Sequence, residues 1–179
     1  MKKILAILAV FAISGVAPAA TLNWTLSNIK TPTDNSVAGA GYAAYLFITE
    51  QSGDFGAKTT TSTEIESLIK SKGDLTDYIA ATKTATTAGS VTGATGYYGN
   101  FGAGDSLTAF AVVFDSSNYA DAKNYIITPT QSASWTSSTG FKNLVFGSQK
   151  DATWTAVPEP STAVLALAGL ALLLKRRKA

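Results

Sequence analysis

Two nearly continuous apolar runs of strand length constrain this fold more than any other feature of the chain. Residues 42–48 read Tyr-Ala-Ala-Tyr-Leu-Phe-Ile, and residues 107–114 read Leu-Thr-Ala-Phe-Ala-Val-Val-Phe. A strand with one solvated face alternates apolar and polar residues, whereas a run without that alternation is covered on both faces. We therefore predict a central, two-sided strand at residues 41–50 and a second strand at 106–115. The core residues expected there are Leu46, Ile48, Phe110, Val112 and Phe114.

The other strand signals are shorter and favour a mainly β fold. Leu22, Trp24 and Leu26 alternate with polar residues, which predicts a strand at residues 21–29. The Thr-, Ala- and Gly-rich residues 82–104 are expected to form loop with one weak strand. Three later strands are predicted, at residues 124–128, 133–137 and 141–146. Short strands separated by turns, without regular β-α alternation, predict an antiparallel β-sandwich with a short helical insertion.

The helical insertion is predicted from a capping pattern. Thr63 and Glu66 have the spacing of a capping box, in which each side chain satisfies a backbone N–H near the other residue. Apolar residues follow at helical spacing, at Ile65, Leu68 and Ile69. This predicts a helix at residues 64–72, closed by Gly73. Asp74 can cap a second helix, which the same spacing predicts at Leu75, Tyr78 and Ile79.

The composition excludes several classes of function. The chain has no cysteine and no histidine, so disulfides, the usual zinc ligands and a Ser-His pair are all missing. Its net charge of +2 comes from basic residues at the two ends. Residues 20–157 hold eight lysines, eleven acidic residues and no arginine, a charge of about −3. Without a basic patch, nucleic-acid binding is not expected.

The N-terminus has the pattern of a secretory signal peptide. Two lysines precede an apolar core at residues 4–13, and small residues follow. Ala17 and Ala19 form the Ala-x-Ala pattern that signal peptidase cleaves. We predict cleavage after Ala19, with cleavage after Ala20 as the alternative, so that the exported β-rich domain spans residues 20–156.

The C-terminus combines a proline-flanked acid, a short apolar run and a basic cluster. The first part reads Val157, Pro158, Glu159 and Pro160, and an uncharged run of mostly Ala and Leu follows at residues 161–174. As a helix this run would be about 21 Å long, shorter than the roughly 30 Å hydrocarbon core of a bilayer. The basic cluster, which favours the cytoplasmic side, is Lys175, Arg176, Arg177 and Lys178. The tail suits either a plain membrane anchor or a removable sorting signal.

Residues 157–179 resemble the PEP-CTERM sorting signal of exported proteins in Gram-negative bacteria that have an exosortase. The resemblance implies recognition by a membrane transpeptidase-like sorting enzyme, cleavage near the motif, and delivery to the cell surface or extracellular matrix. It also implies that Pro158, Glu159 and Pro160 are recognition residues read by that enzyme, and not a catalytic site of this chain.

Two short matches to enzyme motifs are better explained by structure. Ser67 and Lys70 have the Ser-x-x-Lys spacing of penicillin-interacting serine enzymes, but the partner motifs occur in the wrong order and the domain is too small. Residues 39–44 match the dinucleotide pattern Gly-x-Gly-x-x-Ala, which must follow a strand and open a helix. Here a turn precedes the pattern and a strand is predicted after it.

Acidic and aromatic residues suggest two binding hypotheses. Asp115 and Asp121 flank a turn, and Asp105 precedes the strand that leads to it. Loop carboxylates can bind calcium, although turn chemistry explains these acids equally well, and no cofactor or metal is predicted. Aromatic rings can stack on sugars, and core packing is the competing explanation. The aromatic residues concerned are Trp24, Trp135, Trp154, Tyr97 and Tyr98.

These observations predict a non-enzymatic surface or matrix protein with a structural or adhesive role. The expected partners are signal peptidase, an exosortase-type enzyme, the membrane through the C-terminal apolar helix, and extracellular polysaccharide. A carbohydrate-binding module is the alternative, and a small carboxylate-based hydrolase is a further one. Flat aromatic rings on one exposed face would favour the binding module, and two carboxylates about 5–9 Å apart in a groove would favour the hydrolase.

Overall fold

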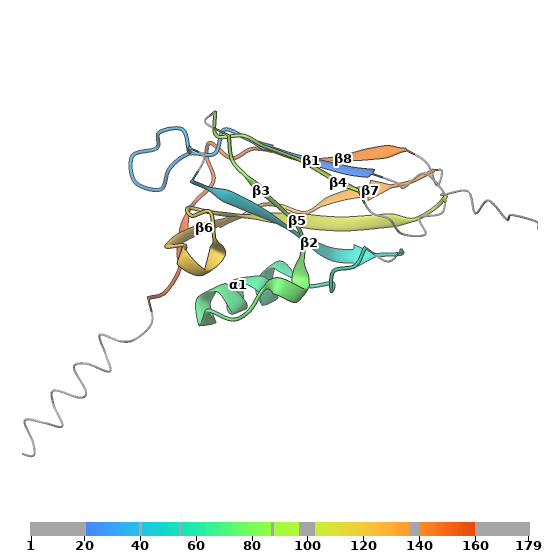
Figure 1. Cartoon of the computed structure of the whole chain (residues 1–179), viewed down its shortest axis with the longest axis horizontal. Coiled ribbons are helices and arrows are strands. Elements are labelled where there is room, and N and C mark those ends of the chain that lie inside the picture. The colour runs from blue at the N-terminus through green and yellow to red at the C-terminus, as the bar shows by residue number, and fades with distance from the viewer. Residues whose placement is uncertain are drawn as a thin grey trace, which may run out of the picture.

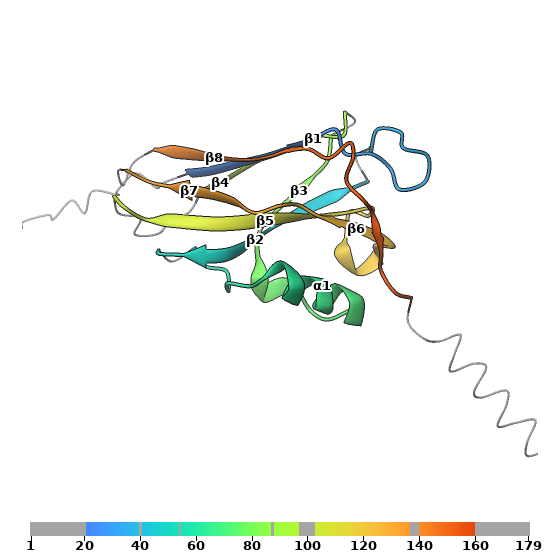
Figure 2. The same cartoon turned by 180° about the vertical axis from the view of Figure 1, so that it is seen from behind.

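Two β-sheets lie face to face, and one α-helix covers the outer face of the larger sheet (Figure 1). The computed structural model describes residues 21–39, 41–53, 55–86, 88–96, 103–136 and 140–159. The view from behind shows the same three layers, with the helix α1 on the side away from the smaller sheet (Figure 2). The predicted mainly β class with one helix is confirmed. The predicted terminal helices lie outside the described residues.

The smaller sheet joins strands from distant parts of the chain. Its order is β4 (Val91–Gly96), β1 (Thr21–Ser27), β8 (Phe141–Ser148). β1 pairs with β4 in antiparallel orientation and with β8 in parallel orientation. The expectation of antiparallel pairing is therefore wrong for this one pair. A parallel pair needs a crossover connection, and here everything between β1 and β8 supplies it.

The larger sheet is antiparallel throughout its described pairs. Its strands, in sheet order, are β3 (Ile79–Thr84), β2 (Ala43–Gln51), β5 (Ser106–Phe114), β6 (Asn124–Ile127) and β9 (Thr155–Ala156). A sixth strand, β7 (Gln131–Ser134), pairs with the first half of β5. β2 and β5 occupy the centre, as their apolar runs predict.

The two central strands are buried on both faces because each face contributes to a different core. Alternate residues of β2 and β5 point between the sheets, where they meet the apolar side of β1 and β8. The residues between them point toward α1. All five predicted core residues are fully buried. Leu46 and Ile48 lie between the sheets, and Phe110, Val112 and Phe114 lie under the helix.

The alternation predicted for β1 is confirmed, with Leu22, Trp24 and Leu26 buried between the sheets. Trp24 lies opposite Gly93 of β4. A Cβ atom at Gly93 would lie 2.4 Å from Trp24 Nε1, a distance that no packed pair of atoms tolerates. The indole therefore occupies the space that any side chain at position 93 would need.

The helix α1 (Ser62–Ser71) begins two residues earlier than predicted. Its N-cap is Thr61, whose hydroxyl accepts a hydrogen bond from Glu64 N (3.1 Å), so the prediction of Thr63 as cap is wrong. Residues 60–63 all carry hydroxyls, and burial of Ile65 and Ile69 against the sheet selects the start. At the other end Lys72, not Gly73, takes the left-handed conformation (φ 54°).

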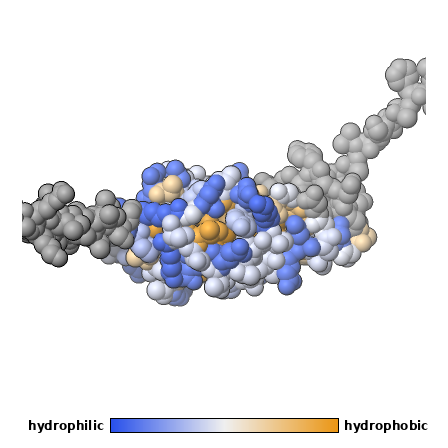
Figure 3. Space-filling model, turned by 90° about the horizontal axis from the view of Figure 1, so that it is seen from below, coloured by the Kyte–Doolittle hydropathy of each residue, from blue (hydrophilic) through white to orange (hydrophobic). Residues whose placement is uncertain are grey.

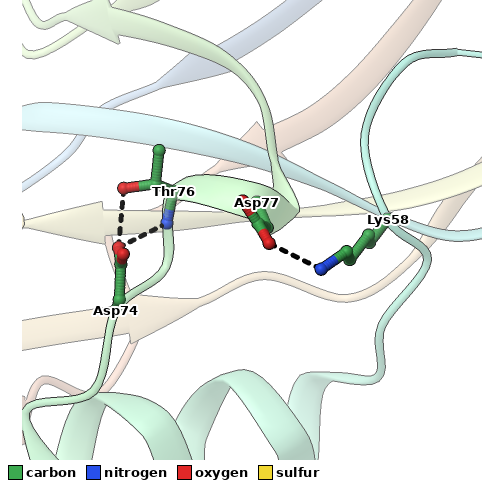
Figure 4. Close-up of polar contacts among 4 residues, drawn as sticks. All are labelled: Lys58, Asp74, Thr76 and Asp77. Atoms are coloured by element: carbon green, nitrogen blue, oxygen red, sulfur yellow. Dashed lines mark hydrogen bonds and ion pairs between the residues drawn. The ribbon is translucent and has the colours of Figure 1, made fainter.

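The predicted second helix is wrong beyond one short turn. Thr76–Tyr78 form the 3-10 turn η1, and Asp74 Oδ1 accepts hydrogen bonds from Thr76 N (2.9 Å) and Thr76 Oγ1 (2.6 Å) (Figure 4). Asp77 in the same turn forms an exposed ion pair with Lys58 (2.5 Å). Ile79 then begins β3 and lies opposite Phe47 in the sheet, so strand pairing overrides the helical spacing.

Within the described ranges, no helix is long and apolar enough to cross a membrane.

Removing the observed cap should destabilise the protein measurably. Thr61→Ala is expected to lower the free energy of unfolding by about 1 kcal/mol, because Glu64 N loses its acceptor. Thr63→Ala is the matched control and should change stability by less than about 0.5 kcal/mol. Urea unfolding of both variants measures the difference. A larger loss for Thr63→Ala would restore Thr63 as the cap.

Candidate functional site

The chain leaves the fold beside β6 and α1, immediately after β9 (Figures 1 and 2). β9 pairs with β6 through Asn124 opposite Ala156 and Tyr125 opposite Thr155. One residue later, Val157 N donates a hydrogen bond to Lys123 O (2.7 Å). The Val157 side chain is buried in the cluster under α1. The fold thus extends through Val157.

Pro158 and Glu159 are exposed directly after this last fixed residue. The predicted motif therefore begins in the core with Val157 and continues on the surface without a spacer. The remaining predicted residues lie outside the described part of the chain: Pro160, Lys175, Arg176, Arg177 and Lys178 of the tail, and Ala17 and Ala19 of the signal peptide.

A loop braced by Asp115 holds β6 in place for β9. Asp115 Oδ1 accepts hydrogen bonds from Lys123 N (2.8 Å) and Asn124 N (3.0 Å), and its Oδ2 accepts one from Asn124 Nδ2 (2.8 Å). Within the loop, the 3-10 turn η2 (Tyr119–Asp121) is capped by Asn118, whose Oδ1 accepts from Ala120 N (3.1 Å). This turn chemistry accounts for Asp115, one of the three acids considered for calcium. No group of three metal-ligating side chains occurs among the described residues.

A cavity of about 390 Å³ lies where the end of α1 meets η2 and Val157. Its apolar lining comes from Ile69, Phe114 and Val157, and its polar lining includes Lys72 and Asp74. A wider groove shares Lys72 and Val157 with it and runs past Lys123 to Pro158 and Glu159. Seen from the α1 side, the molecule shows a small hydrophobic area surrounded by hydrophilic residues (Figure 3).

One polar contact joins α1 to β6 behind the exit, and an ion pair within α1 shares its acceptor. Tyr125 of β6 donates its hydroxyl to Glu66 Oε1 (3.1 Å), and Lys70 pairs with the same oxygen (2.8 Å). The hydrogen bond from Lys70, followed by that from Tyr125, lowers the pKa of Glu66. Burial, followed by the bond to Glu66, raises the pKa of Tyr125 to about 12. The neutral phenol and the carboxylate therefore stabilise each other.

The Tyr125 phenol should make stability sensitive to alkali. Its pKa is raised to about 12 in the folded protein, against an ordinary value near 10. The contribution to stability is therefore complete below pH 10 and lost as the pH rises toward 12. Tyr125→Phe should abolish this loss, and Tyr78→Phe is the control. Chemical unfolding at pH 9 and 11 measures the free energy of unfolding of each variant. An equal fall between the two pH values in Tyr125→Phe and Tyr78→Phe would contradict the prediction.

The two motifs that resemble enzyme sites show no catalytic arrangement. Ser67 is exposed on α1, and Lys70, the other residue of that motif, forms an ion pair with Glu66. After Gly39 and Gly41 the chain enters the strand β2, as the interpretation against dinucleotide binding predicts.

The tryptophans considered for sugar stacking belong largely to the core. Trp24 and Trp135 are buried, so neither ring presents a flat face to solvent. Trp154 is half-buried, donates its Nε1–H to Lys30 O (2.9 Å) and meets the ring of Tyr42 edge-on at 5.8 Å. Tyr97 and Tyr98 lie outside the described residues.

Sequence reasoning found the motif but missed the surface that surrounds it. Lys72 reaches the exit from the end of α1, and Tyr119 and Lys123 reach it from the loop before β6, so no local pattern joins the two segments. One signal was present for β9: a short β-prone run at residues 154–157, Trp-Thr-Ala-Val, leads into the motif and shares Val157 with it.

Comparison with known protein families locates the sorting function. The family described as the PEP-CTERM protein-sorting motif matches residues 156–178. No curated protein and no solved structure matches the chain. The matched segment starts in β9, includes the buried Val157 and the exposed Pro158 and Glu159, and confirms the resemblance given above. The chain carries a PEP-CTERM sorting motif, which implies export to the bacterial cell envelope and processing by an exosortase-type enzyme.

Proposed function

We propose that the domain spanning residues 20–157 is a non-enzymatic structural or adhesive component of the outer surface or extracellular matrix of a Gram-negative bacterium. Signal peptidase removes the N-terminal leader, and the sorting enzyme acts at the C-terminal motif. The observation that carries this proposal is the matched motif at residues 156–178, joined to a fold that keeps Pro158 and Glu159 exposed. The domain then acts by being present at the surface, with extracellular polysaccharide as its expected neighbour.

Three of the acidic side chains are poorly suited to act as general acids near neutral pH. A carboxyl that works as a general acid near neutral pH needs a raised pKa. The hydrogen bond from the Thr31 hydroxyl lowers the pKa of Asp34 to about 2. Hydrogen bonds from Thr76 likewise lower the pKa of Asp74, and that from Lys70 lowers the pKa of Glu66. These shifts move the three groups away from the range that acid catalysis requires.

Processing at both ends is the first expected result. In a host that encodes an exosortase, the surface-recovered protein should lack the first 19 or 20 residues and the basic residues 175–178. Glu159→Ala should leave the tail attached, because the acid between the two prolines is part of the recognised motif. Asp151→Ala, an exposed acid outside the motif, should be processed normally. Intact mass spectrometry reads all three outcomes. Recovery of wild-type protein with the basic cluster attached would reduce the tail to a plain anchor.

The absence of catalysis needs its own test on the mature protein recovered from that host. A panel of glycosides, peptides and esters should show no turnover, and a glycan array should be run beside it. Turnover abolished by one Asp or Glu substitution would overturn the non-enzymatic role. Glycan binding lost in Tyr97→Ala or Tyr98→Ala would instead favour the carbohydrate-binding alternative.

A further inference from the structure

The exit from the fold leaves very little chain between the domain and the apolar tail. Val157 is fixed by its buried side chain, by the hydrogen bond to Lys123 O (2.7 Å) and by the β9–β6 pairing before it. The apolar run begins at Ser161, four residues later. Even a fully extended chain places the Cα atoms of these two residues within about 14 Å of each other.

The length of the run makes this connection tighter. A membrane-inserted run of this length covers about 21 Å of a hydrocarbon core that is about 30 Å thick. Because the run is shorter than the hydrocarbon core, none of its residues can serve as a spacer above the membrane. Either the bilayer thins around it or Ser161 is drawn to the hydrocarbon boundary. The headgroup layer above that boundary is roughly 5–8 Å thick. With Ser161 at that boundary, Val157 can therefore stand at most about 6–9 Å above the headgroup layer, which keeps the residues around it beside the membrane surface.

We propose that, until the tail is removed, the face around the exit lies on the phosphate-bearing headgroups of the membrane. This exit face consists of Lys72, Ala120, Asp121 and Lys123, all exposed and all lining the groove that ends at Glu159. The proposal rests on the sorting function proposed above, because it needs the tail to enter the membrane.

The residues of the exit face fit a lipid surface. Lys72 and Lys123 place two ammonium groups beside the exit, where lipid phosphates are within reach of the short connection. Asp121 and Glu159 also line the groove, so net charge is not what brings the domain to the membrane. The short connection brings it there, and the lysines face the headgroups as a consequence. The exposed residues of β8, by contrast, lie on the smaller sheet, away from α1 and the exit (Figures 1 and 2).

Single cysteines test this orientation, because the native chain has none to interfere. The full chain carries Ala120→Cys, Lys123→Cys or, as the control on β8, Val145→Cys, each labelled with an environment-sensitive fluorophore. The labelled chain is reconstituted in vesicles of phosphatidylcholine and phosphatidylglycerol (3:1) with a nitroxide on some headgroups. Quenching at positions 120 and 123 should exceed quenching at position 145 several-fold. Inserting twelve Gly and Ser residues between Glu159 and Pro160 should remove the difference.

Each contrary outcome has a defined meaning. Equal quenching at the three positions in a chain that floats with the vesicles would overturn the proposal and leave the sorting function intact. Quenching that persists after the Gly and Ser insertion would also overturn it, because the short connection would not be the cause. A chain that fails to float overturns it as well, and the intact-mass assay, which uses no vesicles, decides the sorting function separately.

Discussion

Replacing Phe110 with alanine should lower the free energy of unfolding by about 3–5 kcal/mol. Phe110 is fully buried at the centre of β5, on the face that α1 covers. Its ring stacks on Phe47 with centroids 5.5 Å apart, so truncation leaves a cavity between the sheet and the helix. For a domain of this size the loss corresponds to a fall in Tm of roughly 10–15 °C, measurable by calorimetry.

Phe141→Ala is the matched control, because it removes the same ring from the surface. Phe141 is 66% exposed at the start of β8, so its truncation should change stability by no more than about 0.5 kcal/mol. Reductant and chelator should leave the Tm of the wild-type protein unchanged. Equal losses for Phe110→Ala and Phe141→Ala would show that the core under the helix is not packed as described.

Gly93→Ala should cost about 1–3 kcal/mol, because one added methyl group has no space. The new Cβ atom would lie 2.4 Å from Trp24 Nε1, 2.6 Å from Trp24 Cε2 and 3.1 Å from Lys83 Cγ. The lysine chain can move aside, but the indole is fully buried between the sheets and is rigid. Either the ring leaves its position or β4 separates from β1, and both should appear as a lower Tm and altered tryptophan fluorescence.

Gly41→Ala provides the control for the change of glycine to alanine itself. A Cβ atom at Gly41 meets nothing within 4 Å. Alanine there should be neutral or stabilising by a few tenths of a kcal/mol, because it restricts the unfolded chain. If Gly93→Ala proved as mild as Gly41→Ala, the close approach of Trp24 to β4 would be refuted.

Local patterns predicted the central strands and the core because burial on both faces is visible in the residues themselves. The apolar runs that hold Leu46 and Phe110 needed no knowledge of their partners. The division of these residues between two cores could not be predicted, since it depends on which face α1 covers. The cap was missed for a similar reason: Thr61 and Thr63 have equal capping chemistry, and tertiary packing chooses between them.

Strand pairing between distant residues explains the other differences between the elements predicted from the sequence and those in the structure. Leu75, Tyr78 and Ile79 have helical spacing, but Ile79 lies opposite Phe47 and joins the sheet. The sorting motif was predictable because another protein reads it as a linear pattern. Its attachment to the fold was not, because β9 is two residues long and its partner is set by the loop that Asp115 braces.

The parallel pairing of β1 with β8 has a consequence for the order of folding. Thr21 lies opposite Phe141, so the first strand of the exported domain must wait for almost the last one. Contacts between residues so far apart in the chain slow the search for the native state. During synthesis β1 remains without this neighbour until the ribosome has released β8. The smaller sheet is therefore completed only after nearly the whole domain has been synthesised.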